Sequence, residues 1–209
     1  MHEALCTRHE ARGTRHSLLT TKYMILIIDL CYKKDSLHKN EFVLPIERIV
    51  KNTGYAAQII HYSELEKKQI DVAEKIILCG TALKDNEYIK HLDRFEWLRN
   101  VDKPVLGICA GMQVIGLIFG AKLIEALEIG ITKLKVASRP EHRLWTMDYG
   151  LTVYELHNYA IEPLENFDVL AYSDVCIQAI KHKRKDIYGI NFHPEVRQQK
   201  IVENFLNYR

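Results

Sequence analysis

The sequence predicts an α/β domain built on an open, mostly parallel sheet flanked by helices, with antiparallel strands added in its second half. Strongly apolar segments of strand length alternate with amphipathic helical segments through the first half of the chain. Strand-like pieces joined by short turns follow, before one closing helix. A chain of 209 residues with 47% hydrophobic content can also bury one substantial core.

In the first half of the chain, predicted strands alternate with predicted helices. MILIIDL, which begins at Met24, predicts the first strand, and apolar residues at helical spacing over 41–54 predict a helix that ends at Gly54. The following segments then predict, in order, strands at 56–62 and 75–80, a helix at 86–100, a strand at 103–109 and a helix at 111–119.

The second half reads as a run of strands. They are expected at 121–126, 131–137, 151–157, 167–173, 175–182 and 186–193, with a helix over 195–209. Residues 1–23 are polar, rich in His and Arg, and show no clear period. We therefore expect residues 1–23 to form a disordered N-terminal extension, and residues 24–209 to form the domain.

Composition excludes several classes of function. The 29 Lys and Arg residues nearly balance the 27 Asp and Glu residues, and the basic residues are spread along the chain, which argues against nucleic-acid binding. No apolar run approaches the ~18 residues of a membrane span. The cysteine pattern has no CxxC pair, which argues against a disulfide framework or a structural zinc site. We expect a cytoplasmic protein whose partners are small molecules or other proteins.

One cysteine occupies a position suited to catalysis. In GICAG, Cys109 lies where an apolar strand turns into a helix, between small residues that permit a tight turn. Unpaired N–H groups and the dipole at a helix N-terminus favour a thiolate. Buried cysteines are common and mostly inert, so this motif alone leaves a packed thiol as the alternative.

A second motif supplies a base and a group to orient it. In YGINFHPEV, an apolar strand delivers His193, and Glu195 follows two residues later, where it can orient the imidazole. A histidine at a strand end is more often a surface or hydrogen-bonded residue. Taken together, the two motifs contain a nucleophile, a base and an orienting carboxylate.

With these two motifs the sequence resembles the class I, or triad, glutamine amidotransferases. G-x-C-x-G and F-H-P-E mark that family, and the likeness extends over residues 24–209. The resemblance implies a flavodoxin-like sheet and hydrolysis of L-glutamine to glutamate through a thioester on Cys109, with His193 and Glu195 completing the triad. GICAGMQ and HPEV resemble the amidotransferase part of GMP synthetase more than they resemble the anthranilate-type subunits.

The resemblance also implies further roles. The N–H groups of Gly80 and Ala110 would form the oxyanion hole, and Gln113, His157 and Asn158 would bind glutamine. This half-reaction needs no metal or organic cofactor. Because the chain has no Gly-rich nucleotide loop, ATP and magnesium are expected only on a separate synthetase chain that receives the ammonia.

Three segments depart from the family pattern. In CGTALKD, Thr81 and Ala82 stand in place of a second glycine and a proline. In YELHNYA, other residues stand in place of a Ser-His step. Asn191 stands where relatives carry glutamine. These changes concern the second oxyanion donor and specificity more than the triad. Two alternative functions stay open: a free-standing hydrolase of γ-glutamyl compounds, and a non-catalytic relative that binds glutamine and reports on nitrogen status.

Overall fold

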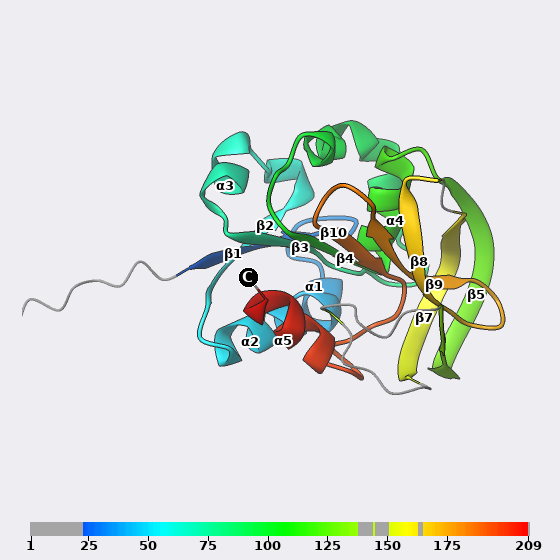
Figure 1. Cartoon of the computed structure of the whole chain (residues 1–209). Coiled ribbons are helices and arrows are strands. Elements are labelled where there is room, and N and C mark those ends of the chain that lie inside the picture. The colour runs from blue at the N-terminus through cyan, green and yellow to red at the C-terminus, as the bar shows by residue number, and fades with distance from the viewer. Residues whose placement is uncertain (1–22, 138–143, 145–150, 163–164, 209) are drawn as a thin grey trace, which may run out of the picture.

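The computed structural model describes residues 23–137, 144, 151–162 and 165–208, and its core is an eight-stranded sheet (Figure 1). The strand order is β2-β1-β3-β4-β10-β9-β8-β6. The first five strands are mutually parallel and the last three continue the sheet antiparallel. The order of the parallel half is the flavodoxin-like one, so the predicted fold class is confirmed. The strands are β1 (Met24–Asp29), β2 (Ala56–His61), β3 (Lys75–Leu78), β4 (Val105–Ile108), β6 (Lys135–Val136), β8 (Phe167–Tyr172), β9 (Ile177–His182) and β10 (Ile187–Ile190).

Helices cover both faces of this sheet (Figure 1). Alternate residues of β1 face opposite ways: Ile25 and Ile27 pack in the core that includes α2 and α5, whereas Leu26 and Ile28 pack in the core that includes η2 and α4. Burial on both faces explains why the parallel strands are almost wholly apolar. The helices are α1 (His38–Phe42), α2 (Leu44–Asn52), η1 (Tyr62–Glu64), α3 (Lys67–Val72), η2 (Glu87–Arg99), α4 (Ala110–Ile118) and α5 (Lys200–Asn207).

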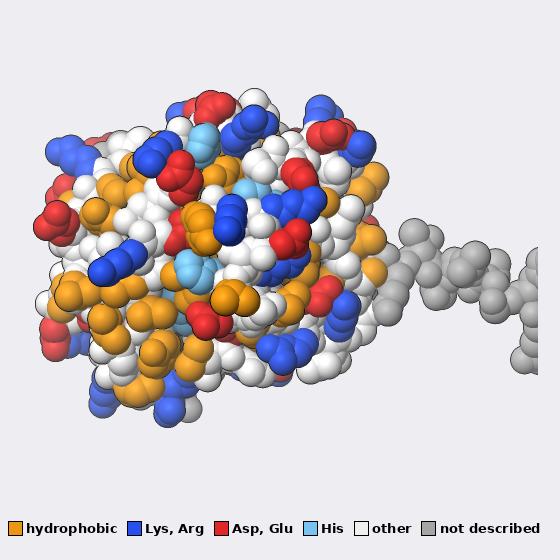
Figure 2. Space-filling model, turned by 180° about the vertical axis from the view of Figure 1, so that it is seen from behind, with side chains coloured by type: hydrophobic (Ala, Val, Ile, Leu, Met, Phe, Trp, Pro, Cys, Tyr) orange, Lys and Arg blue, Asp and Glu red, His pale blue; other side chains and the backbone are white. Residues whose placement is uncertain are grey.

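A separate two-stranded antiparallel sheet pairs β5 (Lys122–Lys133) with β7 (Thr152–Glu162). Its outer side carries exposed apolar side chains, with Leu127, Ile129 and Ile131 each 60–63% exposed. Figure 2 shows hydrophobic side chains gathered at the lower left, the side on which β5 lies when the view of Figure 1 is turned. Apolar areas of this kind mark contact surfaces more often than isolated exposed side chains do.

Several elements differ from the sequence-based expectation. The helix expected at 41–54 is two helices, because Pro45 lacks an N–H and begins α2 instead of continuing α1. The helix expected at 86–100 is the 3₁₀ segment η2, which is interrupted at His91. The strand expected at 121–126 extends into the long strand β5, which has a register shift between Glu125 and Glu128. The strand expected at 131–137 is divided between the end of β5 and the short strand β6 of the main sheet.

The helices between β2 and β3, η1 and α3, were not expected. The helix α3 has no buried residue and therefore no apolar period to detect, but a capping box between Glu66 and Gln69 secures its start. Of the expected N-terminal extension, residues 1–22 lie outside the described residues. In the part of the chain that is described, no helix combines the length and the apolar character needed to cross a membrane.

Candidate active site

The candidate catalytic side chains gather at the carboxyl ends of three neighbouring parallel strands. Strand β4 lies between β3 and β10 in the sheet. Cys109 directly follows β4, Gly80 follows β3, and His193 follows β10. Parallel strands place their carboxyl ends at one edge of a sheet, which is where ligands bind in open α/β folds. The topology therefore places Cys109 between the loop that carries Gly80 and the loop that carries His193.

Cys109 adopts the backbone conformation of a strained elbow. Its φ is 49° and its ψ is −107°, a combination that non-glycine residues rarely adopt. Its N–H donates to the Ile190 carbonyl of β10 at 2.7 Å, and its own carbonyl accepts from the N–H of Gln113 at 3.1 Å, at the start of α4. The side chain is 4% exposed, and its thiol donates to the Leu156 carbonyl at 3.8 Å.

His193 and Glu195 form a buried pair. The imidazole Nδ1 lies 2.7 Å from Glu195 Oε1, and both side chains are almost completely buried. The other ring nitrogen, Nε2, is buried and has no hydrogen-bond partner among the described residues. Phe42 of α1 packs against the ring, with centroids 5.3 Å apart. The ring is therefore held by a carboxylate and an aromatic side chain while Nε2 stays available.

The electrostatics of this pair favour a protonated imidazole. Burial alone lowers the pKa of His193, but the charge of Glu195, together with the neighbouring Cys109, outweighs it and holds the pKa well above its ordinary value. A cationic imidazole beside a thiol favours a thiolate. A protonated imidazole beside a cysteine is the arrangement expected of a base and its nucleophile, and these roles of His193 and Cys109 stay a prediction.

Gly80 lies against both reactive side chains. A Cβ atom on Gly80 would stand 2.7 Å from His193 Cε1 and 3.2 Å from Cys109 Cβ. Only glycine fits at this position, since the imidazole lies directly over it. Gly80 is therefore next to both Cys109 and His193, and its role as an oxyanion donor stays a prediction. Ala110, the first residue of α4, follows the nucleophile directly.

The unusual loop after Gly80 is fastened by Asp85, a residue that the sequence patterns did not single out. Thr81 Oγ1 donates to Asp85 Oδ2 at 2.6 Å, and the Tyr32 N–H donates to the same oxygen at 2.6 Å. The side chain of Thr81, which replaces a family glycine, thereby holds the loop. The only sequence signal for Asp85 is its place at the end of CGTALKD.

Gln113 is fully engaged within the protein. The Tyr88 hydroxyl donates to its Oε1, and its Nε2 donates to the Tyr159 carbonyl at 3.0 Å. Gln113 is 2% exposed, so contact with glutamine requires it to exchange one of these bonds. Its substrate-binding role stays a prediction. Tyr88 was not predicted, because it lies in η2, whose period gave no sign of the site.

Residues of β7 cover the nucleophile. Leu156, His157 and Asn158 line a cavity beside Cys109 of only about 10 Å³. A cavity of this size has room for about one water molecule and none for glutamine. Both ring nitrogens of His157 already have neighbours, with Nδ1 lying 2.8 Å from the Ala126 carbonyl and Nε2 3.2 Å from Gln178 Nε2. The predicted binding of glutamine by His157 and Asn158 is not decided by this geometry.

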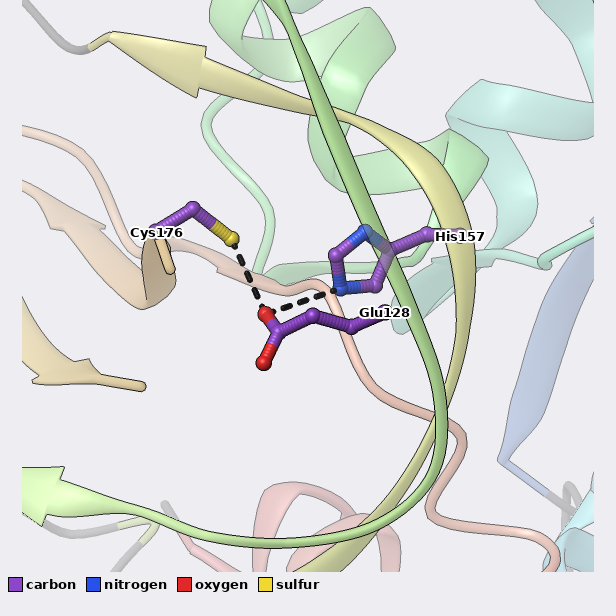
Figure 3. Close-up of side chains that lie close together, drawn as sticks. All are labelled: Glu128, His157 and Cys176. Atoms are coloured by element: carbon purple, nitrogen blue, oxygen red, sulfur yellow. Dashed lines mark hydrogen bonds and ion pairs between the residues drawn. The ribbon is translucent and has the colours of Figure 1, made fainter. Parts of the chain in front are cut away.

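A second cysteine, histidine and glutamate set lies close by (Figure 3). Glu128 Oε2 is 3.6 Å from His157 Nε2 and 3.4 Å from Cys176 Sγ. Burial raises the pKa of the Cys176 thiol to about 12, and the charge of Glu128 acts in the same direction. A thiol of this kind is a poor nucleophile, so this set does not compete with Cys109 for the catalytic role.

Comparison with known proteins assigns the fold and site to a class. The family Glutamine amidotransferase class-I matches residues 38–207, a span that contains the elbow cysteine and the histidine–glutamate pair. The chain belongs to the class I glutamine amidotransferase family.

Two relatives and one solved structure show which members of this family the chain is similar to. The chain is 32% identical over 192 residues to the glutamine-hydrolysing GMP synthase subunit of Methanocaldococcus jannaschii, covering 87% of this chain and 95% of that protein. It is 32% identical over 168 residues to the corresponding subunit of Thermoplasma volcanium, covering 76% and 82%. A crystal structure described as a candidate GMP synthase subunit from Thermoplasma acidophilum superimposes with a TM-score of 0.75 at 27% identity, over 88% of this chain and 93% of that one.

Proposed function

We propose that this chain is a glutaminase subunit that hydrolyses glutamine at Cys109 and passes the ammonia to a synthetase on another chain. The observation that carries the proposal is the strained Cys109 elbow beside the buried His193–Glu195 pair. Family membership supports glutamine hydrolysis, and the geometry supports these three residues as its triad.

The first half of the reaction forms a thioester. The Cys109 thiolate attacks the side-chain amide carbon of glutamine, so a carbon–sulfur bond forms and the carbonyl electrons move to oxygen. The N–H groups of Gly80 and Ala110 stabilise the oxyanion, a contribution worth about 2.7–4 kcal/mol per donor in related sites. The carbon–nitrogen bond then breaks, and the His193 imidazolium gives its proton to the departing ammonia.

The second half releases glutamate. His193, now neutral, takes a proton from a water molecule, which attacks the thioester carbon and forms a second oxyanion. The carbon–sulfur bond breaks, glutamate leaves, and the Cys109–His193 ion pair is restored. Glu195 holds the ring through Nδ1 and stabilises its cationic form in both halves.

The relatives suggest which synthetase receives the ammonia. The two relatives compared above are named as the glutamine-hydrolysing subunit of GMP synthase, and the chain covers 82% and 95% of them. We infer that the partner is the ATP-dependent subunit of a GMP synthetase. The exposed apolar side of β5, formed by Leu127, Ile129 and Ile131, supports the existence of a partner contact.

Trapping of the thioester tests the proposal. The chain is mixed with glutamine and the candidate synthetase subunit, ATP and its nucleotide acceptor, quenched in acid, and digested for mass spectrometry. A γ-glutamyl adduct is expected on the peptide that contains Cys109. An adduct on another cysteine, or glutamate release that is unchanged in Cys109→Ser, would contradict the assignment. Hydrolysis of other γ-glutamyl compounds without any partner would instead identify a free-standing hydrolase.

A further inference from the structure

The Glu128, His157 and Cys176 cluster lies outside the glutaminase mechanism and joins the two sheets. Glu128 is on β5, His157 is on β7, and Cys176 is in the turn before β9 of the main sheet. Figure 3 shows the three side chains directed towards a common point. One ligand atom from each lies within 4.8 Å of the other two.

The spacing of these atoms matches a metal site. Glu128 Oε2 is 3.4 Å from Cys176 Sγ and 3.6 Å from His157 Nε2. With zinc bond lengths of about 2.0–2.3 Å, the ligand atoms of a tetrahedral site lie about 3.3–3.7 Å apart. These two separations therefore need almost no movement to accept an ion.

The amide of Gln178 stands at a fourth position. Its Nε2 is 2.7 Å from Glu128 Oε2, 3.2 Å from His157 Nε2 and 3.3 Å from Cys176 Sγ. Its Oε1 is buried and has no hydrogen-bond partner among the described residues. Turning the amide round would place Oε1, a metal-binding atom, opposite the other three ligands.

The imidazole of His157 is oriented as metal-bound imidazoles are. Its Nδ1 lies 2.8 Å from the Ala126 carbonyl oxygen, which can only accept a hydrogen bond. The proton of the neutral ring is thus on Nδ1, and the lone pair of Nε2 faces the cluster. A backbone carbonyl that fixes the tautomer in this way is the usual outer partner of a histidine ligand.

A buried carboxylate supplies an independent sign that a cation belongs here. Glu155 is completely buried, its Oε2 lies 3.2 Å from His157 Nε2, and neither of its oxygens makes a hydrogen bond to a described residue. Across the described ranges, neither Glu128 nor Glu155 forms an ion pair with a lysine or arginine. Their ion-pair partner is the His157 imidazole, which the two carboxylates share, and a cation bound between them would lower the cost of burying Glu155.

We propose that Glu128, His157 and Cys176, with Gln178 Oε1 as the fourth ligand, bind one divalent transition-metal ion, for which zinc is the best match. A sulfur, nitrogen and oxygen donor set suits zinc, and four protein ligands leave no position for a substrate, as in structural zinc sites. The ion would fasten the β5–β7 sheet to the main sheet. It would also fix Leu156, the neighbour of His157, against the Cys109 thiol.

Cobalt titration of the chelator-treated full chain, without a histidine tag, tests this site. One equivalent of Co²⁺ is expected to bind, with a sulfur-to-cobalt charge-transfer band in the near ultraviolet that Zn²⁺ abolishes by competition. The Cys176→Ser variant should lose the band and bind Co²⁺ about a hundredfold more weakly. Glu155→Gln, which keeps the shape of the side chain, should weaken binding by at least about tenfold.

Matched control variants identify which cysteine supplies the sulfur ligand of the bound Co²⁺. Cys109→Ser, Cys6→Ser and Ser173→Ala should each keep the band, because none removes a proposed ligand. Ser173 borders the site and donates to Glu128 Oε2 at 2.8 Å. Circular dichroism checks that every variant is folded. If Cys176→Ser does not fold, the weaker Co²⁺ binding expected of Glu155→Gln tests the site instead. Absence of stoichiometric binding, or a band that disappears only in Cys109→Ser or Cys6→Ser, would overturn the proposal without affecting the glutaminase assignment.

Discussion

At the scale of single residues, the conformation of Cys109 links backbone strain to chemistry. Its positive φ of 49° places a non-glycine residue in a region that costs about 1–3 kcal/mol. The hydrogen bond to Ile190 and the packing of α4 offset this cost. The strained turn places Cys109 directly before the first helical residue, Ala110, and beside Gly80, which also lies against His193.

Replacement of the nucleophile should abolish hydrolysis. We expect Cys109→Ser to lower kcat for glutamate release, measured in the presence of the synthetase, by a factor on the order of 10⁴ or more, because serine is a weak nucleophile without thiolate character. Cys31→Ala is the control, since Cys31 is a buried thiol whose pKa is raised to about 12 by burial. Retention of activity in Cys109→Ser, or an equal loss in folded Cys31→Ala, would contradict the assigned role.

Removal of the Glu195 charge should change both rate and pH dependence. Glu195→Gln is expected to be about a hundredfold less damaging to kcat than Cys109→Ser, because the nucleophile and base remain. Glu195 holds the pKa of His193 above its unfolded value, so the native state keeps a proton that the unfolded state loses. That contribution to stability is complete below about pH 6.5 and is lost as the pH rises through the raised native pKa.

Urea unfolding at pH values from 6 upward measures the effect. Wild-type stability should fall with rising pH more steeply than that of Glu195→Gln, by up to about 1.4 kcal/mol per pH unit. The variant should therefore be most destabilised at the acidic end of the series. Parallel curves for the two proteins would show that Glu195 does not raise the pKa of His193.

At the scale of elements, the β4–α4 turn depends on glycines where backbones meet. A Cβ atom on Gly111 would lie 2.4 Å from the Leu78 carbonyl oxygen of β3, which cannot move aside cheaply. On the same helix, a Cβ on Gly116 would meet Ile161 Cδ1 at 2.5 Å and Ile161 Cγ2 at 2.9 Å, which are side-chain atoms and yield more readily than a backbone carbonyl. Alanine at position 111 would therefore clash with the backbone of Leu78, whereas alanine at position 116 would clash with the side chain of Ile161.

This contrast predicts unequal effects on stability. Gly111→Ala should lower the free energy of unfolding by about 1–3 kcal/mol and reduce glutaminase activity, because it pushes the helix start away from β3. Gly116→Ala should lower it less, since the gain in helix propensity of about 1 kcal/mol offsets part of the cost of repacking Ile161. Denaturant unfolding compares the two. Equal stability of both variants would show that the approach of α4 to β3 is not tight.

At the scale of the whole molecule, the loop after β3 separates two spaces. One is the cavity of about 10 Å³ beside Cys109, and the other is an open hollow of about 620 Å³ lined by Tyr32, His38 and neighbouring residues. Ala82, Leu83, Asp85 and Asn86 line both. We expect glutamine to enter only if this loop moves and joins the hollow to the cavity, and Asp85 fastens the loop by accepting from Tyr32 and Thr81.

The closed site predicts dependence on a partner. The isolated chain should release glutamate slowly, and addition of the synthetase subunit with ATP and its acceptor should raise kcat/KM by about tenfold or more, equivalent to at least about 1.4 kcal/mol of barrier. Steady-state glutamate release with and without the partner measures this. Full activity of the isolated chain, unchanged by the partner, would show that the loop opens unaided.

The amino-acid sequence by itself determined the α/β class and most strands, because apolar segments buried on both faces are visible without knowledge of their neighbours. It also singled out Cys109, His193 and Glu195, because the elbow and F-H-P-E are local patterns. It did not predict α3, whose stability comes from caps, or the break in η2 at His91. Such features carry little or no apolar period.

Only the tertiary structure decided what surrounds those residues. Asp85, Tyr88 and Leu156 are distant from Cys109 in sequence and reach the site because β3, η2 and β7 meet there. The absence of CxxC spacing argued against zinc, yet Glu128, His157 and Cys176 converge from three separate segments. Local patterns specify strands, turns and reactive residue types, whereas contacts between distant segments depend on how the sheet brings their ends together.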